Sequence, residues 1–245
     1  MFFFKKNKIP LSEVFPKDFV DIHSHLLPGI DDGAKTLEDA IALLTNMRSY
    51  GIKNFITTPH VLGDVYPNSS AMIHRKLEEV KAALAANNLH DINIRAAAEY
   101  MLDEQFSERL VQDDILALKD NYVLVEMSYF SAPLNLYEML YELQLKGYIP
   151  VLAHPERYSF YHRDFQAYYK LKKAGCLFQL NLLSLTPYYG KNVQNISKQL
   201  LKNNLYDFVG TDTHHMRHLD SLPQIGNKKL CSLIAHLLEN NRKLL

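Results

Sequence analysis

The chain alternates short apolar runs with longer amphipathic segments, and this alternation constrains its fold more than any other feature. Seven runs have the length and the content of β-branched and aromatic residues that are typical of buried strands: residues 19–23, 54–58, 92–98, 122–127, 149–153, 177–182 and 207–210. Strands that alternate with helices in this way form a parallel sheet with the helices outside it. The sequence therefore predicts an α/β fold, but alternation alone does not distinguish a closed barrel from an open, doubly wound sheet.

Several of the intervening segments carry apolar residues at intervals of three and four, which is the spacing of an amphipathic helix. We expect helices at residues 36–50, 70–87, 134–146, 164–174 and 227–244. Thr36, with Glu38 and Asp39 in the first turn after it, suits a helix N-terminus. Gly175 suits the end of the fourth helix.

Length and composition favour one cytoplasmic domain. A chain of 245 residues suits a single α/β barrel, and no linker or repeat divides it, so we expect one domain over residues 1–245 with residues 1–17 as an N-terminal extension. The 27 basic and 27 acidic residues balance, which argues against a protein that binds duplex nucleic acid. Only two cysteines occur, Cys176 and Cys231, which is typical of a reducing compartment. We find neither a signal peptide nor an apolar run long enough to span a membrane.

Side chains of the kind that bind metals stand where the predicted strands end. Six of the seven strands end in, or lead at once into, such residues: His23 with His25, His60, Glu99, Glu126, His154, and Asp212 with His214. In a parallel barrel these ends lie on one face, where catalytic loops gather. Side chains two apart on a strand point the same way, so each His-x-His or Asp-x-His pair can hold one ion. One such residue is more often structural, but six such strand ends together predict a metal site.

The residue types limit the metal and suggest a reaction. Imidazole and carboxylate ligands without a thiolate suit Zn, Mn or Fe rather than Ca, and the set is larger than one tetrahedral ion needs. We therefore expect two or three ions, which would stabilise charge on a phosphoryl group and activate water. Arg157, three residues after His154, could hold two phosphate oxygens; the alternatives are a solvated side chain or a pair with Glu156. The pattern predicts a metal-dependent phosphoesterase.

Other hydrolytic chemistries lack their motifs in this sequence. Neither cysteine begins a Cys-x5-Arg phosphate loop, and no Gly-x-Ser-x-Gly elbow or Walker-type loop is present. Tyr129, Tyr158 and Tyr161 fall in loops on the predicted active face and are candidates for the wall of a pocket.

Taken in order, the motifs resemble those of the polymerase and histidinol phosphatase (PHP) superfamily. They are His23-Ser-His25, Asp31-Asp32-Gly33, Thr58-Pro-His60, Glu99, Glu126, His154-Pro-Glu-Arg157 and Asp212-x-His214, spread over most of the chain. Within that superfamily the chain resembles the bacterial manganese-dependent protein-tyrosine phosphatases of capsule and exopolysaccharide operons.

This resemblance implies a fold, a metal centre and a substrate. The fold would be a distorted seven-stranded (β/α) TIM-like barrel, and the centre would hold two or three ions, with Mn preferred and Fe or Zn as alternatives. The implied ligands are His23, His25, Asp32, His60, Glu99, Glu126, His154, Asp212 and His214. Asp32 is favoured over Asp31 because it directly precedes the glycine, Glu99 would bridge ions, and Arg157 would contact phosphate. The implied substrate is the phosphorylated, tyrosine-rich tail of a membrane-anchored tyrosine autokinase that controls polysaccharide export.

Some roles stay open at this point. His60 or Asp212 could act as a general acid for the leaving phenolate, beside Arg157 as the phosphate-binding residue. His215 could be an extra ligand or acid, and Arg217 with His218 does not match the pattern of the relatives. The alternative functions are a small-molecule phosphomonoesterase like histidinol phosphatase and a metal-binding regulatory module without turnover.

Overall fold

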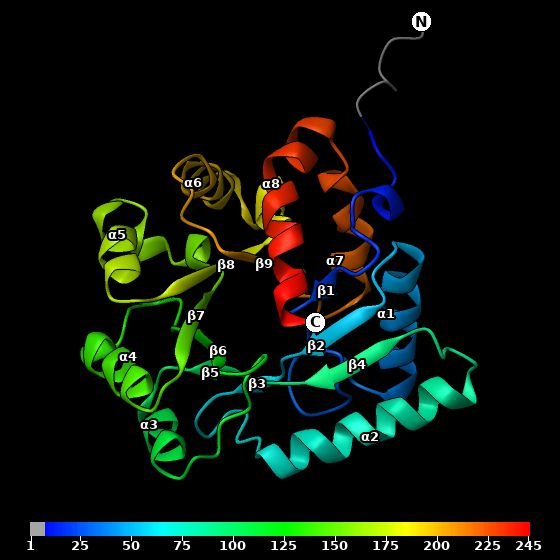
Figure 1. The fold of residues 1–245 in the computed structure, drawn as a ribbon, viewed down its shortest axis with the longest axis horizontal. Coiled ribbons are helices and arrows are strands. Elements are labelled where there is room, and N and C mark those ends of the chain that lie inside the picture. The colour runs from blue at the N-terminus through cyan, green and yellow to red at the C-terminus, as the bar shows by residue number, and fades with distance from the viewer. Residues whose placement is uncertain (1–7) are drawn as a thin grey trace, which may run out of the picture.

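The computed structural model describes residues 8–245 and contains an α/β fold whose strands all run parallel (Figure 1). Two sheets are present in this range, one in the order β1-β2-β4 and one in the order β3-β5-β6-β7-β8-β9. The strands are β1 Val20–Asp21, β2 Asn54–Thr57, β3 His60–Val61, β4 Asn93–Ala96, β5 Glu99–Met101, β6 Tyr122–Glu126, β7 Ile149–Ala153, β8 Leu177–Asn181 and β9 Phe208–Gly210. Each of the seven predicted strands is confirmed; β3 and β5 are additional.

The two additional strands arise because the second and third predicted strands each bend and continue into the other sheet. Pro59, which has no N–H to donate to a ladder, separates β2 from β3. The Glu99 N–H donates to the Pro59 carbonyl oxygen at 3.1 Å, so the neighbouring strand follows the same bend. Beyond the bend His60 pairs with Glu99 in the parallel register of β3 and β5. The bend therefore brings two predicted ligands side by side.

The first and last strands also meet, which curls the sheet. The Asp212 N–H donates to the His23 carbonyl oxygen at 2.7 Å, and an isolated parallel bridge joins Ser24 to Thr213. Both carboxylate oxygens of Asp21 accept hydrogen bonds from Thr211, at 2.9 and 2.7 Å. The α/β class is confirmed, and the predicted barrel is found as a curled parallel sheet that forms a half-barrel.

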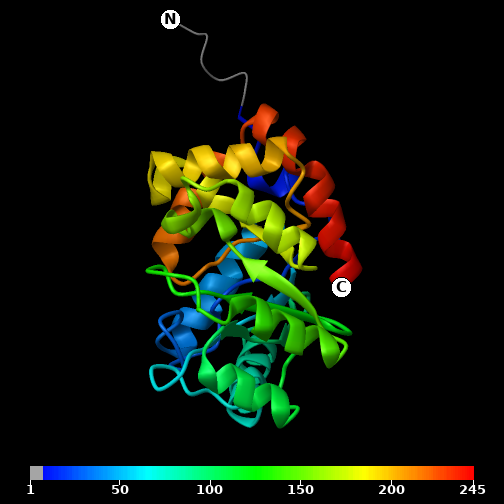
Figure 2. The same cartoon turned by 90° about the vertical axis from the view of Figure 1, so that its left-hand side faces the viewer.

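Helices surround the strands on the outside (Figures 1 and 2). They are α1 Leu37–Ser49, α2 Ser70–Ala86, α3 Glu104–Val111, α4 Leu136–Leu145, α5 Gln166–Lys173, α6 Lys191–Lys202, α7 Met216–Ser221 and α8 Lys228–Asn240. The five predicted helices are confirmed, and Thr36 forms a capping box with Asp39. We did not expect α3, α6 and α7, because they are short or largely polar. None of the helices in residues 8–245 has the length and apolarity needed to cross a membrane.

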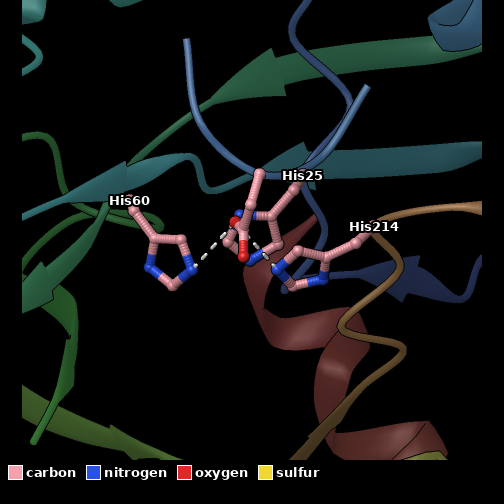
Figure 3. A group of neighbouring side chains, drawn as sticks. His25, His60 and His214 are labelled. Atoms are coloured by element: carbon pink, nitrogen blue, oxygen red, sulfur yellow. Dashed lines mark ion pairs between the residues drawn. The ribbon is translucent and has the colours of Figure 1, made fainter. Parts of the chain in front are cut away.

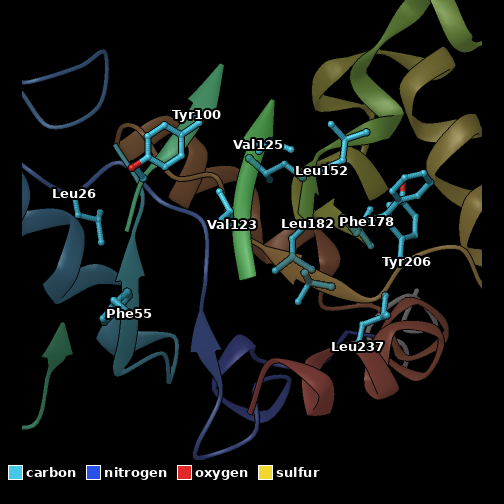
Figure 4. Close-up of a cluster of buried hydrophobic side chains, with 14 of the residues drawn as sticks. Leu26, Phe55, Tyr100, Val123, Val125, Leu152, Phe178, Leu182, Tyr206 and Leu237 are labelled. Carbon is cyan, nitrogen blue, oxygen red and sulfur yellow. The ribbon is translucent and has the colours of Figure 1, made fainter. Parts of the chain in front are cut away.

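The packing of β6 in the core determines the side of the strand on which Glu126, its last residue, lies. Along β6, Val123 and Val125 belong to the large hydrophobic cluster shared with the helices, part of which is drawn in Figure 4. Leu124 belongs to a smaller cluster on the other side of the strand. Because side chains alternate along a strand, Glu126 lies on the same side as Leu124.

Residues 8–17, within the predicted N-terminal extension, pack against the rest of the chain. The short 3₁₀ helix Leu11–Glu13 buries Leu11, and Phe15 is also buried. The Ile9 N–H donates to the Gly226 carbonyl oxygen at 2.8 Å, which ties this segment to the residues before α8. The first seven residues of the predicted extension lie outside the described residues.

Candidate metal centre and active site

The fold brings all nine predicted ligands together at the carboxyl ends of the strands. Within residues 8–245 they form four overlapping groups, in each of which the ligand atoms lie within 4.8 Å of one another. The groups are His25, Asp32, His60 and His214; His23, His154 and Asp212; His23, His25 and Glu99; and His60, Glu99 and Glu126. Residues from opposite ends of the sequence meet here because the first and last strands are neighbours.

Glu99 lies at the centre of these groups. One carboxylate oxygen, Oε2, is 3.1 Å from His23 Nε2, 3.4 Å from His25 Nε2 and 3.1 Å from His60 Nδ1. The other oxygen, Oε1, is 3.1 Å from His154 Nε2. The side chain is fully buried. A carboxylate with imidazoles on both oxygens is suited to bridge two cations.

Hydrogen bonds on the far side of each ring aim the histidines at the cluster. His23 Nδ1 is 2.8 Å from the amide oxygen of Gln179, and His25 Nδ1 is 2.8 Å from Asp31 Oδ2. Because both partners accept, each Nδ1 carries the proton and each Nε2 has a lone pair directed at the cluster. These two Nε2 atoms are only 3.3 Å apart. Two facing lone pairs repel each other, so a cation or a proton must lie between them.

The carboxylates of the cluster also require positive charge beside them. Burial lowers the pKa of His60, but the carboxylates of Glu126 and Glu99 outweigh it and raise that pKa to about 9. Burial raises the pKa of Asp212, yet His23 and His214 hold it well below its ordinary value. Buried carboxylates thus stay ionised only with positive charge beside them. Metal ions bound here would supply that charge without protonating the imidazoles.

Several buried polar atoms of the cluster lack any hydrogen-bond partner within residues 8–245. Such atoms indicate whether the cluster is suited to bind metal ions. His60 Nδ1 and Glu99 Oε2 are buried and unpartnered, although they lie only 3.1 Å apart. His60 Nδ1 lies 2.8 Å from Glu126 Oε1, but not in hydrogen-bonding geometry. Unsatisfied buried polar atoms are costly in a folded protein. Donors that converge without satisfying one another fit a centre that holds metal ions.

The structure also separates the roles of the two neighbouring aspartates. Asp32 Oδ1 is 3.5 Å from His60 Nε2 and 3.4 Å from His214 Nε2, and Figure 3 shows these rings with His25 round one carboxylate. Asp31 instead points behind His25 and also accepts the His60 backbone N–H at 3.2 Å. The geometry places Asp32 among the donors and Asp31 as the residue that orients His25.

Two glycines pack tightly against ligand residues of the cluster, and two of the candidate ligands have a strained backbone. A Cβ atom on Gly33 would lie 2.2 Å from the His25 carbonyl oxygen, and one on Gly210 would lie 2.5 Å from His23 Cβ. Any side chain at either position would therefore displace a ligand. His154 and Asp212 have φ values of 34° and 51°, in the left-handed region that non-glycine residues rarely occupy. The surrounding fold holds both residues in strained conformations.

Arg157 lies beside the cluster in a defined position. Its Nη1 donates to Asp212 Oδ2 at 2.7 Å. Its guanidinium carbon lies 4.7 Å from the ring centroid of Tyr129 and 4.3 Å from that of Tyr189. Two aromatic faces and one ion pair thus fix the plane of the guanidinium. Sequence reasoning missed Tyr189, because no motif marks it.

The alternative pairing of Arg157 with Glu156 is not found. Glu156 is fully buried, where its Oε1 accepts the Asn181 backbone N–H at 3.0 Å and its Oε2 accepts the Tyr206 hydroxyl at 2.9 Å. Burial raises the pKa of Glu156. Glu156 therefore anchors the loop that carries Arg157 and does not neutralise it.

A pocket of about 710 Å³ opens over the cluster. Among the three tyrosines named as candidates for its wall, Tyr129 lines it, whereas Tyr158 is buried with its hydroxyl bonded to the Met127 N–H. Tyr161 does not line it. The rest of the lining includes Asp32, His60, Glu126, His154, Arg157, Tyr189, Asp212 and His214, with residues 128–133 as one wall.

The histidines after Asp212 differ in position. His215 lines the pocket but belongs to none of the candidate metal groups within residues 8–245. His218 Nδ1 accepts the His214 backbone N–H at 3.2 Å, so it supports the segment that carries His214. Arg217 is exposed and does not line the pocket.

Replacing Asp31 with alanine should weaken metal binding without removing a binding position. His25 would lose the acceptor that orients its ring, and loss of such a partner costs roughly 10- to 100-fold in metal affinity. Metal content measured during titration with a chelator should show weaker retention but the full number of ions at saturating metal. Asp32→Ala should instead lower the number of ions. The reverse pattern would make Asp31 the ligand.

Known proteins are similar to this chain over most of its length. Residues 19–231 match the family described as capsular polysaccharide synthesis, CpsB/CapC. Tyrosine-protein phosphatase YwqE from Bacillus subtilis is 30% identical over 231 residues, which cover 92% of this chain and 91% of that protein. Tyrosine-protein phosphatase CpsB from Streptococcus pneumoniae is 28% identical over 210 residues, covering 83% of this chain and 85% of that protein.

The fold agrees with that relationship. A crystal structure from the work on YwqE of Bacillus subtilis and CpsB of Streptococcus pneumoniae, described as metal-dependent tyrosine phosphatases, superposes with a TM-score of 0.78 at 29% identity. The superposition covers 90% of this chain and 94% of that one. With a family match over most of its length, the chain belongs to the capsular polysaccharide synthesis family CpsB/CapC.

Proposed function

We propose that this chain is a metal-dependent protein-tyrosine phosphatase. The observation that carries the proposal is the convergence of nine imidazole and carboxylate side chains under a pocket edged by Arg157. Membership of the CpsB/CapC family and relatives named tyrosine-protein phosphatases support it. We further propose that the substrate is the tyrosine-rich tail of a membrane-anchored tyrosine autokinase that controls polysaccharide export.

The nine residues would hold two or three ions, which we propose to be manganese. Ions in such a site activate water and offset the charge of a phosphoryl group. Arg157 can donate to phosphate oxygens with the N–H groups that Asp212 does not occupy. Its position between two tyrosine rings restricts the motion of the guanidinium. The side chain is therefore already oriented before the substrate binds, and binding loses little conformational entropy.

We propose that the leaving phenolate takes its proton from His60 or Asp212. Asp212 Oδ2 already accepts from Arg157 and from Asn181 Nδ2, each at 2.7 Å, and Asp212 Oδ1 faces the imidazoles. Neither oxygen is available to a leaving group. His60 also has both ring nitrogens beside carboxylates, with Nδ1 2.8 Å from Glu126 Oε1 and Nε2 3.5 Å from Asp32 Oδ1. It lines the pocket and would bind an ion through one nitrogen, which would leave the other to carry a proton, so we favour it as the donor.

Three further proposals concern the chain as a whole. We propose that the curled sheet is a distorted seven-stranded barrel and that residues 1–245 act as one domain. Two cysteines without a disulfide, Cys176 and Cys231, support a cytoplasmic location.

The pocket rim favours a protein substrate over a small molecule. Phe130 lines the pocket and is 94% exposed, so an apolar side chain stands at the entrance without a cover from the described residues. An enzyme that encloses a small phosphate ester would bury such a residue. A phosphotyrosine side chain can enter the pocket while its backbone stays outside.

The test is to strip the protein of metal, reload it with manganese, and measure phosphate release from a phosphotyrosine peptide and from histidinol phosphate. We expect release from the peptide that requires metal and resists thiol-blocking reagents. Turnover of histidinol phosphate alone would replace the proposal with a small-molecule phosphomonoesterase. No turnover of either substrate with metal bound would favour a regulatory module.

A further inference from the structure

An exposed apolar strip leads away from the pocket along one side of the molecule. It consists of Phe130, Leu134, Tyr137, Tyr141 and Leu145. Their solvent-accessible areas, relative to a reference value for each residue type, are 94%, 108%, 49%, 62% and 67%. The last three are spaced by four residues on α4, so they lie on one face of that helix. Single exposed apolar residues are ordinary, but three on one helix face with two more in the segment directly before that helix are not.

The core does not account for this strip. The opposite face of α4 already packs inward, through Leu136, Met139, Leu140 and Leu143. A helix needs one apolar stripe to pack against a domain, and α4 carries a second stripe that faces outward. Figure 2 shows α4 on the outside of the sheet. The outward stripe is therefore available to a partner.

The strip is continuous with the pocket. Residues 128–133 form one wall of the pocket, and Phe130 belongs both to this wall and to the strip. Leu134 directly follows that wall, and α4 begins two residues later. The ten residues of α4 span about 15 Å, which is the length of roughly five residues of extended polypeptide.

Acidic side chains border the far end of the strip. A second hollow of about 560 Å³ lies between α3 and α4 and is lined by Leu110, Val111 and Leu145. Glu104, Glu108 and Glu142 line the same hollow, whereas its lysine, Lys146, is paired with Asp113 at 2.9 Å. An occupant with basic residues among apolar ones would match this border.

We propose that the strip binds the polypeptide that flanks the phosphotyrosine of a protein substrate, and that this flank combines apolar and basic residues. The inference rests on the proposed function. A side chain seated in the pocket brings its flanking backbone to the rim, and on the side of residues 128–133 that rim includes the exposed Phe130, with Leu134 as the next residue after this wall. The strip would lower KM for such substrates and leave the chemical step unchanged.

The test compares the manganese-loaded protein with a double variant, Tyr141→Ser with Leu145→Ser, on three probes. The probes are free phosphotyrosine, a phosphotyrosine peptide flanked by leucine and lysine, and one of equal length flanked by glycine and serine. The unaltered protein should prefer the leucine–lysine peptide about 10-fold in kcat/KM, through KM. The double variant should lose that preference while turnover of free phosphotyrosine stays the same. Leu233→Ser, which removes a 40% exposed leucine from α8, is the matched control and should change nothing.

The outcomes separate this inference from the proposed function. Equal turnover of the two peptides by the unaltered protein, with free phosphotyrosine hydrolysed, would overturn the strip and leave the phosphatase assignment intact. A double variant that shifts the protein from dimer to monomer but keeps the peptide preference would make the strip a contact between two copies, and would also overturn the inference. Absence of turnover of all three probes by the unaltered protein would overturn both this inference and the proposed function.

Discussion

Replacing Glu99 with glutamine is expected to lower turnover of a phosphotyrosine peptide by at least about a thousandfold, which corresponds to about 4 kcal/mol. The two oxygens of Glu99 face different histidines, so the neutral amide would remove the negative charge that this side chain would offer to bound ions. The amide keeps the size of the side chain, and the fold should remain intact. Steady-state kinetics with bound metal measured on the same sample checks this result.

Two further variants complete that experiment. His154→Ala, which removes the ring 3.1 Å from Glu99 Oε1, should also lose metal and turnover. Glu78→Gln changes an exposed glutamate on α2 that pairs with Lys81, and it should leave both quantities unchanged. Full turnover with a full complement of metal in Glu99→Gln and His154→Ala would contradict the metal centre.

Arg157→Ala should lower kcat/KM about 100-fold, or about 3 kcal/mol, while metal content stays the same. The guanidinium is the cation that the pocket offers to phosphate besides the metal centre, and its loss affects the transition state more than folding. Metal should remain because Asn181 Nδ2 still donates to Asp212 Oδ2 at 2.7 Å. Arg157→Lys should recover part of the loss, since it restores charge without the bidentate geometry.

Two variants of Tyr189 test whether its ring holds Arg157 in place. Tyr189→Phe keeps the ring 4.3 Å from the guanidinium and should retain most activity. Tyr189→Leu removes the ring and should cause a loss between those of Tyr189→Phe and Arg157→Ala. If Arg157→Ala lost its metal, or if it kept normal kcat/KM, the assigned role of Arg157 would be wrong.

Much of the fold and the candidate site followed from local sequence patterns. Buried strands have a short, apolar, β-branched composition that does not depend on distant contacts, so all seven were predicted within a few residues. Helices with a clear apolar stripe were predicted for the same reason. In contrast, α6 was not predicted although Val193, Ile196 and Leu200 follow the three- and four-residue spacing of a helix, because most of its other residues are polar.

What the sequence by itself determined is eight of the nine candidate ligands, because parallel strands place their carboxyl ends on one face whatever their exact packing. The ninth, Asp32, came from the resemblance to the PHP superfamily. What only the tertiary structure decided is how these side chains are held. The contact of Gln179 with His23 across 156 residues and the stacking of Tyr189 on Arg157 both join segments whose proximity has no local signal. The same holds for Asp31 and Asp32: neighbours on a loop have no fixed period, so backbone geometry alone turns one towards His60 and His214 and the other behind His25.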